Sequence, residues 1–210
     1  MPLIRKPPGA PPAAPRRPDL GTVLRLLAAG SDDERWQAAR AAAELPSSVP
    51  ALGEALTREA VPRVREAIFT SLARIATPQS VEAVLGFLRS DDARARTEAC
   101  DALAAMQSAA WPYLEALLRD PDADVRVLVC GLVRNMPSES AVPLYCELLD
   151  SEAEPNVCAA AIDVLAEIGG PEALPVLARC GERFRATPFL VFAIKVAVDR
   201  IRAQSAPPRA

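Results

Sequence analysis

The chain has 210 residues, of which 50% are hydrophobic and only 4% aromatic, so its core must be built from alanine, leucine and valine, which favours helices over strands. Residues 1–18 hold four basic residues and no acid, which leaves residues 19–210 with 20 basic and 27 acidic residues, a balance of −7. An acidic body argues against binding of duplex nucleic acid, and the absence of histidine removes the commonest general base.

The sequence shows no segment typical of membrane insertion or export and no motif typical of metal binding or catalysis. No apolar run of about 18 residues and no signal-like apolar core occur, so we predict a cytoplasmic protein without membrane insertion. The five cysteines form no CxxC pair, which argues against a disulfide framework or a zinc ribbon, and we expect Cys100 and Cys130 to be small buried residues without a metal or redox role. No glycine-rich phosphate loop, GxSxG motif or paired carboxylates are found, so we predict no catalytic residue, no cofactor and no enzymatic activity.

Residues 1–18 are set apart by their seven prolines, which exclude a helix and favour an extended, disordered segment. Two interpretations stay open for this segment. It is either a solubilising arm, or a docking peptide for an aromatic-lined groove or an acidic partner. Asp19 then provides a plausible N-cap for a helix that begins near Leu20.

From that point one pattern recurs, and its fullest copy is Asp120–Met136. An acidic turn leads into a residue set as position zero, an arginine at +1, and apolar residues at +4, +8 and +11, which form one stripe on a helix. The zero positions are 30, 31, 30, 32 and 33 residues apart, at Glu34, Val64, Ala95, Val125, Val157 and Leu190. The sequence therefore predicts a repeat array.

A leucine-rich helix precedes each of these helices. Four of the leucine-rich stretches carry a proline near their expected start, where its missing N–H costs nothing: Pro50, Pro112, Pro143 and Pro175. The unit is an α-hairpin, and we expect a domain over 19–203 and a flexible tail over 204–210. The six expected units are 20–46, 47–77, 78–107, 108–138, 139–170 and 171–203.

The proline-led helix, the Asp-Pro-Asp-Ala-Asp turn, Val125-Arg126 and the closing apolar helix resemble HEAT-like repeats, of the short bacterial type also found in phycobiliprotein lyase subunits. The resemblance covers about residues 20–203 and implies an all-α fold, a right-handed α-α superhelix of about six hairpins. The last unit lacks both the acidic turn and the arginine, as expected of a terminal cap.

The arginine at +1 recurs in four units, and regular acidic turns accompany it. We interpret this column as a structural ladder of charge-assisted hydrogen bonds that fixes the register of successive repeats. A row of anion-binding sites is the alternative. The ladder residues are Arg35, Arg65, Arg96 and Arg126, with Asp92, Asp122 and Glu154 as their acidic partners.

In the family geometry the second helix of each hairpin lines the concave side, so its exposed positions +2, +6 and +10 are candidates for recognition. They are mixed in sign, which suits a protein partner better than a phosphate backbone, although an ordinary solvated face is the alternative. The candidate residues are Trp36, Arg40, Glu66, Thr70, Arg74, Asp101, Arg134, Asn135, Asp163 and Glu167. Trp36 itself is either a contact residue or packing for the first helix.

The sequence thus predicts a monomeric, non-catalytic adaptor or regulatory scaffold that presents a concave surface to another protein. Two alternatives come from HEAT-like relatives. One is an accessory or lyase-like factor for a cofactor-bearing protein, and the other is a nucleic-acid-binding protein.

Overall fold

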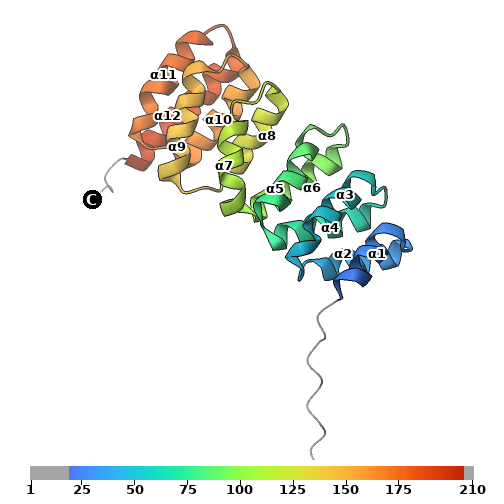
Figure 1. The fold of residues 1–210 in the computed structure, drawn as a ribbon. Coiled ribbons are helices and arrows are strands. Elements are labelled where there is room, and N and C mark those ends of the chain that lie inside the picture. The colour runs from blue at the N-terminus through green and yellow to red at the C-terminus, as the bar shows by residue number, and fades with distance from the viewer. Residues whose placement is uncertain (1–18, 206–210) are drawn as a thin grey trace, which may run out of the picture.

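The computed structural model describes residues 19–205, so the proline- and arginine-rich segment 1–18 and residues 206–210 lie outside the described part. Within it the secondary structure is helical, and no strand is present. Twelve α-helices follow one another with short connections, and three short 3-10 turns accompany them (Figure 1). The α-helices are α1 (Leu20–Ala29), α2 (Asp32–Ala42), α3 (Val49–Arg58), α4 (Pro62–Ile75), α5 (Pro78–Leu85), α6 (Ala93–Ala105), α7 (Gln107–Leu117), α8 (Ala123–Val133), α9 (Ser138–Ser151), α10 (Pro155–Ile168), α11 (Leu174–Arg183) and α12 (Pro188–Ser205). The 3-10 turns are η1 (Pro46–Ser48), η2 (Gly86–Arg89) and η3 (Pro171–Ala173).

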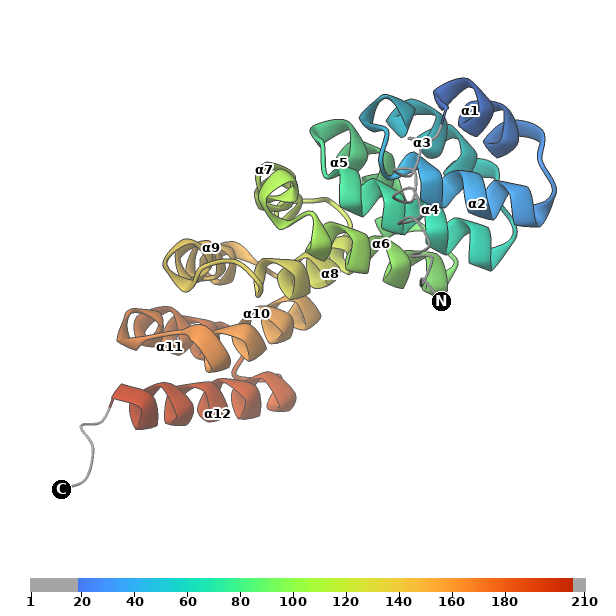
Figure 2. The same cartoon turned by 90° about the horizontal axis from the view of Figure 1, so that it is seen from below.

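Consecutive helices pair into six hairpins, which we call the first to sixth repeats. Even-numbered helices pack on one another along the array, from α2 on α4 to α10 on α12. Figure 2 shows the odd-numbered helices on the outer side of the curved array and the even-numbered helices on its inner side. The all-α solenoid predicted from the sequence is therefore confirmed.

The even-numbered helices begin where their sequences provide caps. Asp92 and Asp122 accept hydrogen bonds from the backbone amides of Arg94 and Asp124, both at 2.9 Å. Proline occupies the first position of α4, α10 and α12, where the helix has no partner for an N–H. In α1, the predicted N-cap Asp19 accepts from the amide of Thr22 at 2.8 Å, which confirms the prediction.

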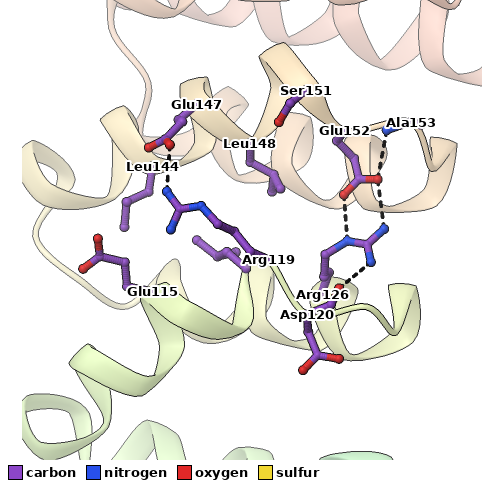
Figure 3. Close-up of a pocket in the computed structure, with 11 residues that line it drawn as sticks. Glu115, Arg119, Asp120, Arg126, Leu144, Glu147, Leu148, Ser151, Glu152 and Ala153 are labelled. Atoms are coloured by element: carbon purple, nitrogen blue, oxygen red, sulfur yellow. Dashed lines mark hydrogen bonds and ion pairs between the residues drawn. The ribbon is translucent and has the colours of Figure 1, made fainter.

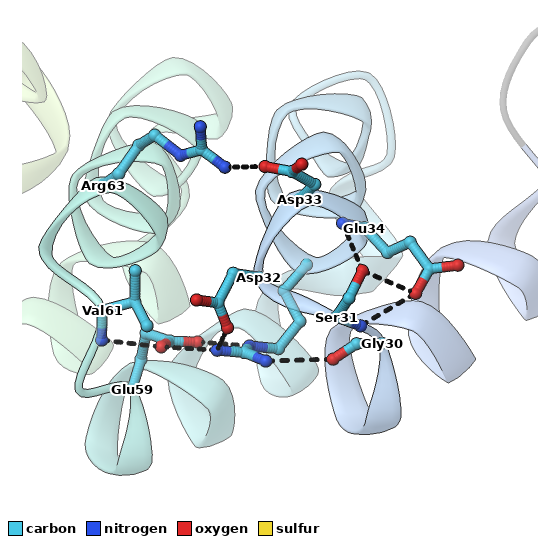
Figure 4. Close-up of polar contacts among 9 residues, drawn as sticks. Gly30, Ser31, Asp32, Asp33, Glu34, Glu59, Val61 and Arg63 are labelled. Carbon is cyan, nitrogen blue, oxygen red and sulfur yellow. Dashed lines mark hydrogen bonds and ion pairs between the residues drawn. The ribbon is translucent and has the colours of Figure 1, made fainter.

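The apolar stripe of the even-numbered helices faces the core. All six residues at +4 are buried, including Ala38, Ile68 and Ala99. The zero position is buried in the second to sixth repeats but not in the first, where Glu34 is exposed. Glu34 instead completes a capping box with Ser31, because its carboxylate accepts from the Ser31 amide at 2.8 Å (Figure 4).

Two of the four leucine-rich helices begin earlier than their prolines predict. Pro50 and Pro175 lie in the first turn of α3 and α11, each preceded by a 3-10 turn. Pro112 and Pro143 lie inside α7 and α9. In all four hairpins a helical turn precedes the proline. This turn is a 3-10 turn before Pro50 and Pro175, and it is part of the α-helix before Pro112 and Pro143.

Candidate partner-binding surface

Two of the +1 arginines, Arg35 and Arg126, reach from one repeat to the acidic residue at the end of the next repeat's first helix. Arg35 donates from Nε to Glu59 Oε2 at 2.8 Å and also binds the carbonyl oxygen of Gly30 at 2.9 Å (Figure 4). Arg126 makes the same contact three repeats later, with Nε donating to Glu152 Oε2 at 2.7 Å and a second nitrogen donating to Oε1 at 2.9 Å. Each such arginine joins two repeats and also holds its own turn.

The acidic partners differ in part from those expected. Asp92 does bind Arg65, at 2.9 Å, together with Glu98 at 2.8 Å. Asp122 and Glu154, however, form no ion pair in the part of the chain that the structure describes, and each caps its own helix. Arg35 and Arg126 bind an acid that lies three residues before the start of the next repeat's second helix. This column reads Glu59, Ser90, Asp120 and Glu152, and the sequence analysis missed it.

The carboxylate of Glu152 is buried, with 6% of its side chain exposed. Burial raises the pKa of Glu152, but hydrogen bonds from Arg126 and from the backbone amides of Glu154 and Ala153 outweigh it and hold the pKa below its usual value. The pKa of Glu59 is lowered in the same way, against burial, by Arg35 and a backbone amide. Both carboxylates therefore stay charged at neutral pH.

A cleft of about 350 Å³ lies beside the second of these pairs, between the fourth and fifth repeats (Figure 3). Its walls are α7 and α9, and Arg119 crosses it to Glu147 with a contact of 2.7 Å. Arg126 and Glu152 form one end, already joined to each other. Two ion pairs of this cleft, Arg119–Glu147 and Arg126–Glu152, thus hold the fourth and fifth repeats together.

The ladder is interrupted between the third and fourth repeats. Arg96 donates to the carbonyl oxygen of its own turn residue Ser90, at 2.6 Å, and forms no ion pair with any described residue. Asp120, which stands where Glu59 and Glu152 stand in their repeats, is bound instead by Arg89. A cleft of about 420 Å³ opens at this seam, next to Arg96.

The predicted inner-face residues lie on the even-numbered helices, and several of them pair across repeats. Arg74 contacts Glu44 at 2.8 Å, and Glu66 lies 3.7 Å from Arg94. In the C-terminal half, Arg134 contacts Asp163 at 2.8 Å and Glu167 at 3.6 Å. Thr70, Asp101 and Asn135 are exposed. Pairing neutralises much of the mixed charge that the sequence shows.

Trp36 is half-buried and packs against the core. The guanidinium carbons of Arg40 and Arg63 lie 4.7 and 5.2 Å from its ring centroid, which are cation–π distances. Arg63 also pairs with Asp33 across the first two helix hairpins (Figure 4). These contacts occupy the N-terminal end of the inner face.

The C-terminal half of this face also carries apolar residues, beside the Arg134–Asp163 pair. Its +2 residues are Val127 and Ala159, both half-buried, and Gly131 at +6 is exposed with open space where a Cβ would stand. On α12 the same helical position carries Phe192, which is 67% exposed, and Phe189 beside it is 50% exposed. The half of the inner face from α8 to α12 therefore combines small residues on α8 and α10 with exposed phenylalanines on α12.

The sequence analysis missed the exposed Phe189 and Phe192, because it assigned the sixth repeat to capping. A capping repeat has a polar outer face, whereas α12 exposes Phe189, Val191 and Phe192 within one turn. A signal was present in the sequence. Phe192 occupies +2 on the sixth frame, where polar or small residues stand in most other repeats.

The cysteine side chains of residues 19–205 lie in the core or pack against it. Burial raises the pKa of the Cys130 thiol to about 12, so this cysteine is an uncharged core residue. No cluster of three or more potential metal ligands occurs among the described side chains. Nor does any helix of the described part combine the length and apolar character needed to cross a bilayer.

Stacked helical hairpins with an exposed inner face define an α-solenoid repeat protein. A family model described as HEAT repeats matches residues 21–104 and 111–183, which is well over half of the chain. The chain therefore belongs to the HEAT repeat family, and the resemblance inferred from the sequence is confirmed.

The chain is similar to several solved structures at low sequence identity. The archaeal HEAT-like repeats protein from Thermococcus onnurineus NA1 has a TM-score of 0.50 and 18% identity, over 86% of this chain and 86% of that one. A designed armadillo repeat protein in complex with the peptide (KR)4 has a TM-score of 0.43 and 17% identity, over 88% and 100%. The complex of CpcE and CpcF of phycocyanin lyase from Nostoc sp. PCC7120 has a TM-score of 0.38 and 15% identity, over 98% and 94%. A comparison with curated proteins finds no match.

Proposed function

We propose that this HEAT repeat protein is a non-catalytic adaptor that binds a partner protein on its inner face, chiefly on the half from α8 to α12. The observation that carries the proposal is the exposure of Phe189, Val191 and Phe192, at 50%, 44% and 67%. Large apolar side chains grouped in this way are costly to leave in water and are typical of interaction sites. Aromatic residues also dominate the energetics of protein interfaces.

The N-terminal half of the same face supports this assignment by contrast. There the exposed charges are joined in pairs such as Arg74–Glu44, and Trp36 is covered by guanidinium groups. A partner would have to break these contacts to bind there. Between α8 and α10 one such pair, Arg134–Asp163, is also present, but the small residues Gly131 and Ala159 lie on these two helices and a partner can contact them without breaking an ion pair.

The test is quantitative affinity capture with the full chain as bait, compared with Phe189→Ser/Phe192→Ser and with the control Ala178→Ser/Glu182→Ser. The control changes exposed residues of α11 in the same repeat. Proteins captured by the wild type and the control, but reduced about tenfold or more with the phenylalanine variant, are expected. Unchanged capture by a phenylalanine variant that is still folded would rule out this surface.

A further inference from the structure

The cleft between the third and fourth repeats is acidic and is not explained by partner binding at α12. Asp91, Asp122 and Asp124 line it and form no ion pair with a described residue. Arg96 is the one lining arginine without a carboxylate partner there, because Arg89 is bound to Asp120. The cleft therefore holds an excess of negative charge that favours a basic occupant.

The same cleft has an apolar side. Half-buried Val127 and Leu128 of α8 line it, and they lead onto the inner face at Gly131. Farther along that face, Asp163 and Glu167 share a single arginine, Arg134. An occupant that fits this surface thus carries large apolar side chains next to basic ones.

A segment of this chain has that composition. Residues 1–18 begin with Leu3-Ile4 followed directly by Arg5-Lys6, contain no acid, and carry seven prolines. We propose that this segment docks back onto the inner face of its own molecule, with Leu3 and Ile4 against Val127 and Leu128. Prolines restrict the free segment to extended conformations, so ordering it costs little entropy.

The length of the segment is sufficient. Asp19 begins the folded array, and Leu3 and Ile4 lie 16 and 15 residues before it. At about 3.1 Å per residue in polyproline II, they reach about 45–50 Å. Helix α8 is three inner-layer helices beyond α2, which at about 10 Å per packed helix is about 30 Å. The remaining 15 Å or so allows the segment to cross from the start of α1 to the inner layer.

Docking of this kind makes the segment an internal competitor at α8, where the docking site overlaps the surface proposed for the partner. Because it is tethered, a contact that is weak between separate molecules is occupied within one molecule. A partner must displace it, so deletion of residues 1–18 is expected to increase partner capture. The inference concerns the same surface as the proposed function but does not require the partner to be known.

The primary test is hydrogen exchange of the full chain against a chain of residues 19–210, which retains all described helices. We expect amides of α8 to exchange several-fold faster in the shorter chain, and a synthetic peptide of residues 1–18 in excess to restore the slower rate. Identical exchange in the two chains, or no effect of the peptide, would overturn the inference.

The second measurement is fluorescence anisotropy of the labelled peptide with the 19–210 chain. Asp91→Lys/Asp124→Lys is expected to weaken binding about tenfold, whereas Glu182→Lys/Asp199→Lys, which reverses two exposed acids elsewhere, changes it about twofold or less. A Leu3→Ser/Ile4→Ser peptide also binds weakly. Equal effects of the two double reversals, or unchanged binding of the serine peptide, would indicate unspecific charge attraction and overturn the proposal.

Two further outcomes separate the alternatives. Concentration-dependent dimerisation of the full chain that is lost on deleting residues 1–18 would show docking between molecules and overturn the intramolecular assignment. If the peptide does not bind but the phenylalanine variant still loses its captured partner, the docking inference fails and the proposed function stands.

Discussion

At the scale of single residues, Arg126 and Arg96 occupy the same position of consecutive repeats but have different surroundings. Arg126 binds the buried carboxylate of Glu152 with two hydrogen bonds, whereas Arg96 binds only a carbonyl oxygen of its own turn. Comparing the two arginines therefore separates the contribution of the ion pair to the free energy of unfolding from the contribution of the hydrogen bond within the turn.

Arg126→Ala is expected to lower the free energy of unfolding by about 2–4 kcal/mol, because it leaves a buried carboxylate without its cation. Arg96→Ala is expected to cost about 1 kcal/mol or less, the value of one hydrogen bond. Urea unfolding followed by circular dichroism measures both. Equal losses would show that the arginine column acts within each turn and not between repeats.

Glu152 also gives the stability a defined pH dependence. Its pKa is lowered in the folded chain, so its contribution is present above the usual glutamate pKa of about 4.3 and is lost as pH falls through the lowered value. The difference in unfolding free energy between the wild type and Glu152→Gln should be constant from about pH 7 to 5 and shrink below about pH 4. A difference that grows on acidification would contradict this linkage. Glu59 is present in both chains, so its own titration cancels.

At the scale of elements, the two glycines Gly169 and Gly86 end helices in different surroundings. A Cβ on Gly169 would stand 2.4 Å from the carbonyl oxygen of Leu165, which accepts the hydrogen bond that ends α10. A Cβ on Gly86 would meet nothing within 4 Å, and the backbone there is helical.

Gly169→Ala is therefore expected to destabilise by about 1–3 kcal/mol, since the end of α10 must shift. Gly86→Ala should stabilise by about 0.4–1 kcal/mol, by restricting the unfolded chain. Thermal melts of the two variants provide the measurement. An unchanged melting temperature for Gly169→Ala would mean that the segment connecting α10 to the sixth repeat can shift without loss of stability.

The sequence predicts the helices well because burial at +4 repeats in every unit and burial at +8 in the first five, as at Ile68 and Leu72. It predicts contacts between repeats less well. Which acid meets Arg126 depends on how two turns are placed in space, because Glu152 and Glu154 lie only two residues apart in the same turn. Phe192 was missed for a related reason, since a helical pattern gives the direction of a side chain but not whether another element covers it.

At the scale of the whole molecule, the seam between the third and fourth repeats divides the array. Helix α8 packs on α6 less extensively than any other pair of neighbouring even-numbered helices. The ladder is also interrupted there at Arg96, and the two segments matched by the HEAT family model end and resume around it, at residues 104 and 111. In a solenoid, stability is a sum of repeats and interfaces, so a weak interface lowers cooperativity.

The two tryptophans report on the two sides of this seam, because Trp36 lies in α2 and Trp111 in α7. Ile68→Ala removes a fully buried side chain of α4 and should cost about 2–5 kcal/mol on the N-terminal side. In the Ile68→Ala chain, we expect the N-terminal side to unfold at a lower urea concentration than the C-terminal side. The N-terminal transition is followed by Trp36 in a chain that also carries Trp111→Phe, and the C-terminal transition by Trp111 in a chain that also carries Trp36→Phe. Ile162→Ala in α10 is the matched change on the other side and should shift Trp111 first. Coincident transitions in both variants would show that the seam transmits stability fully, and that the array unfolds as one unit despite its interrupted ladder.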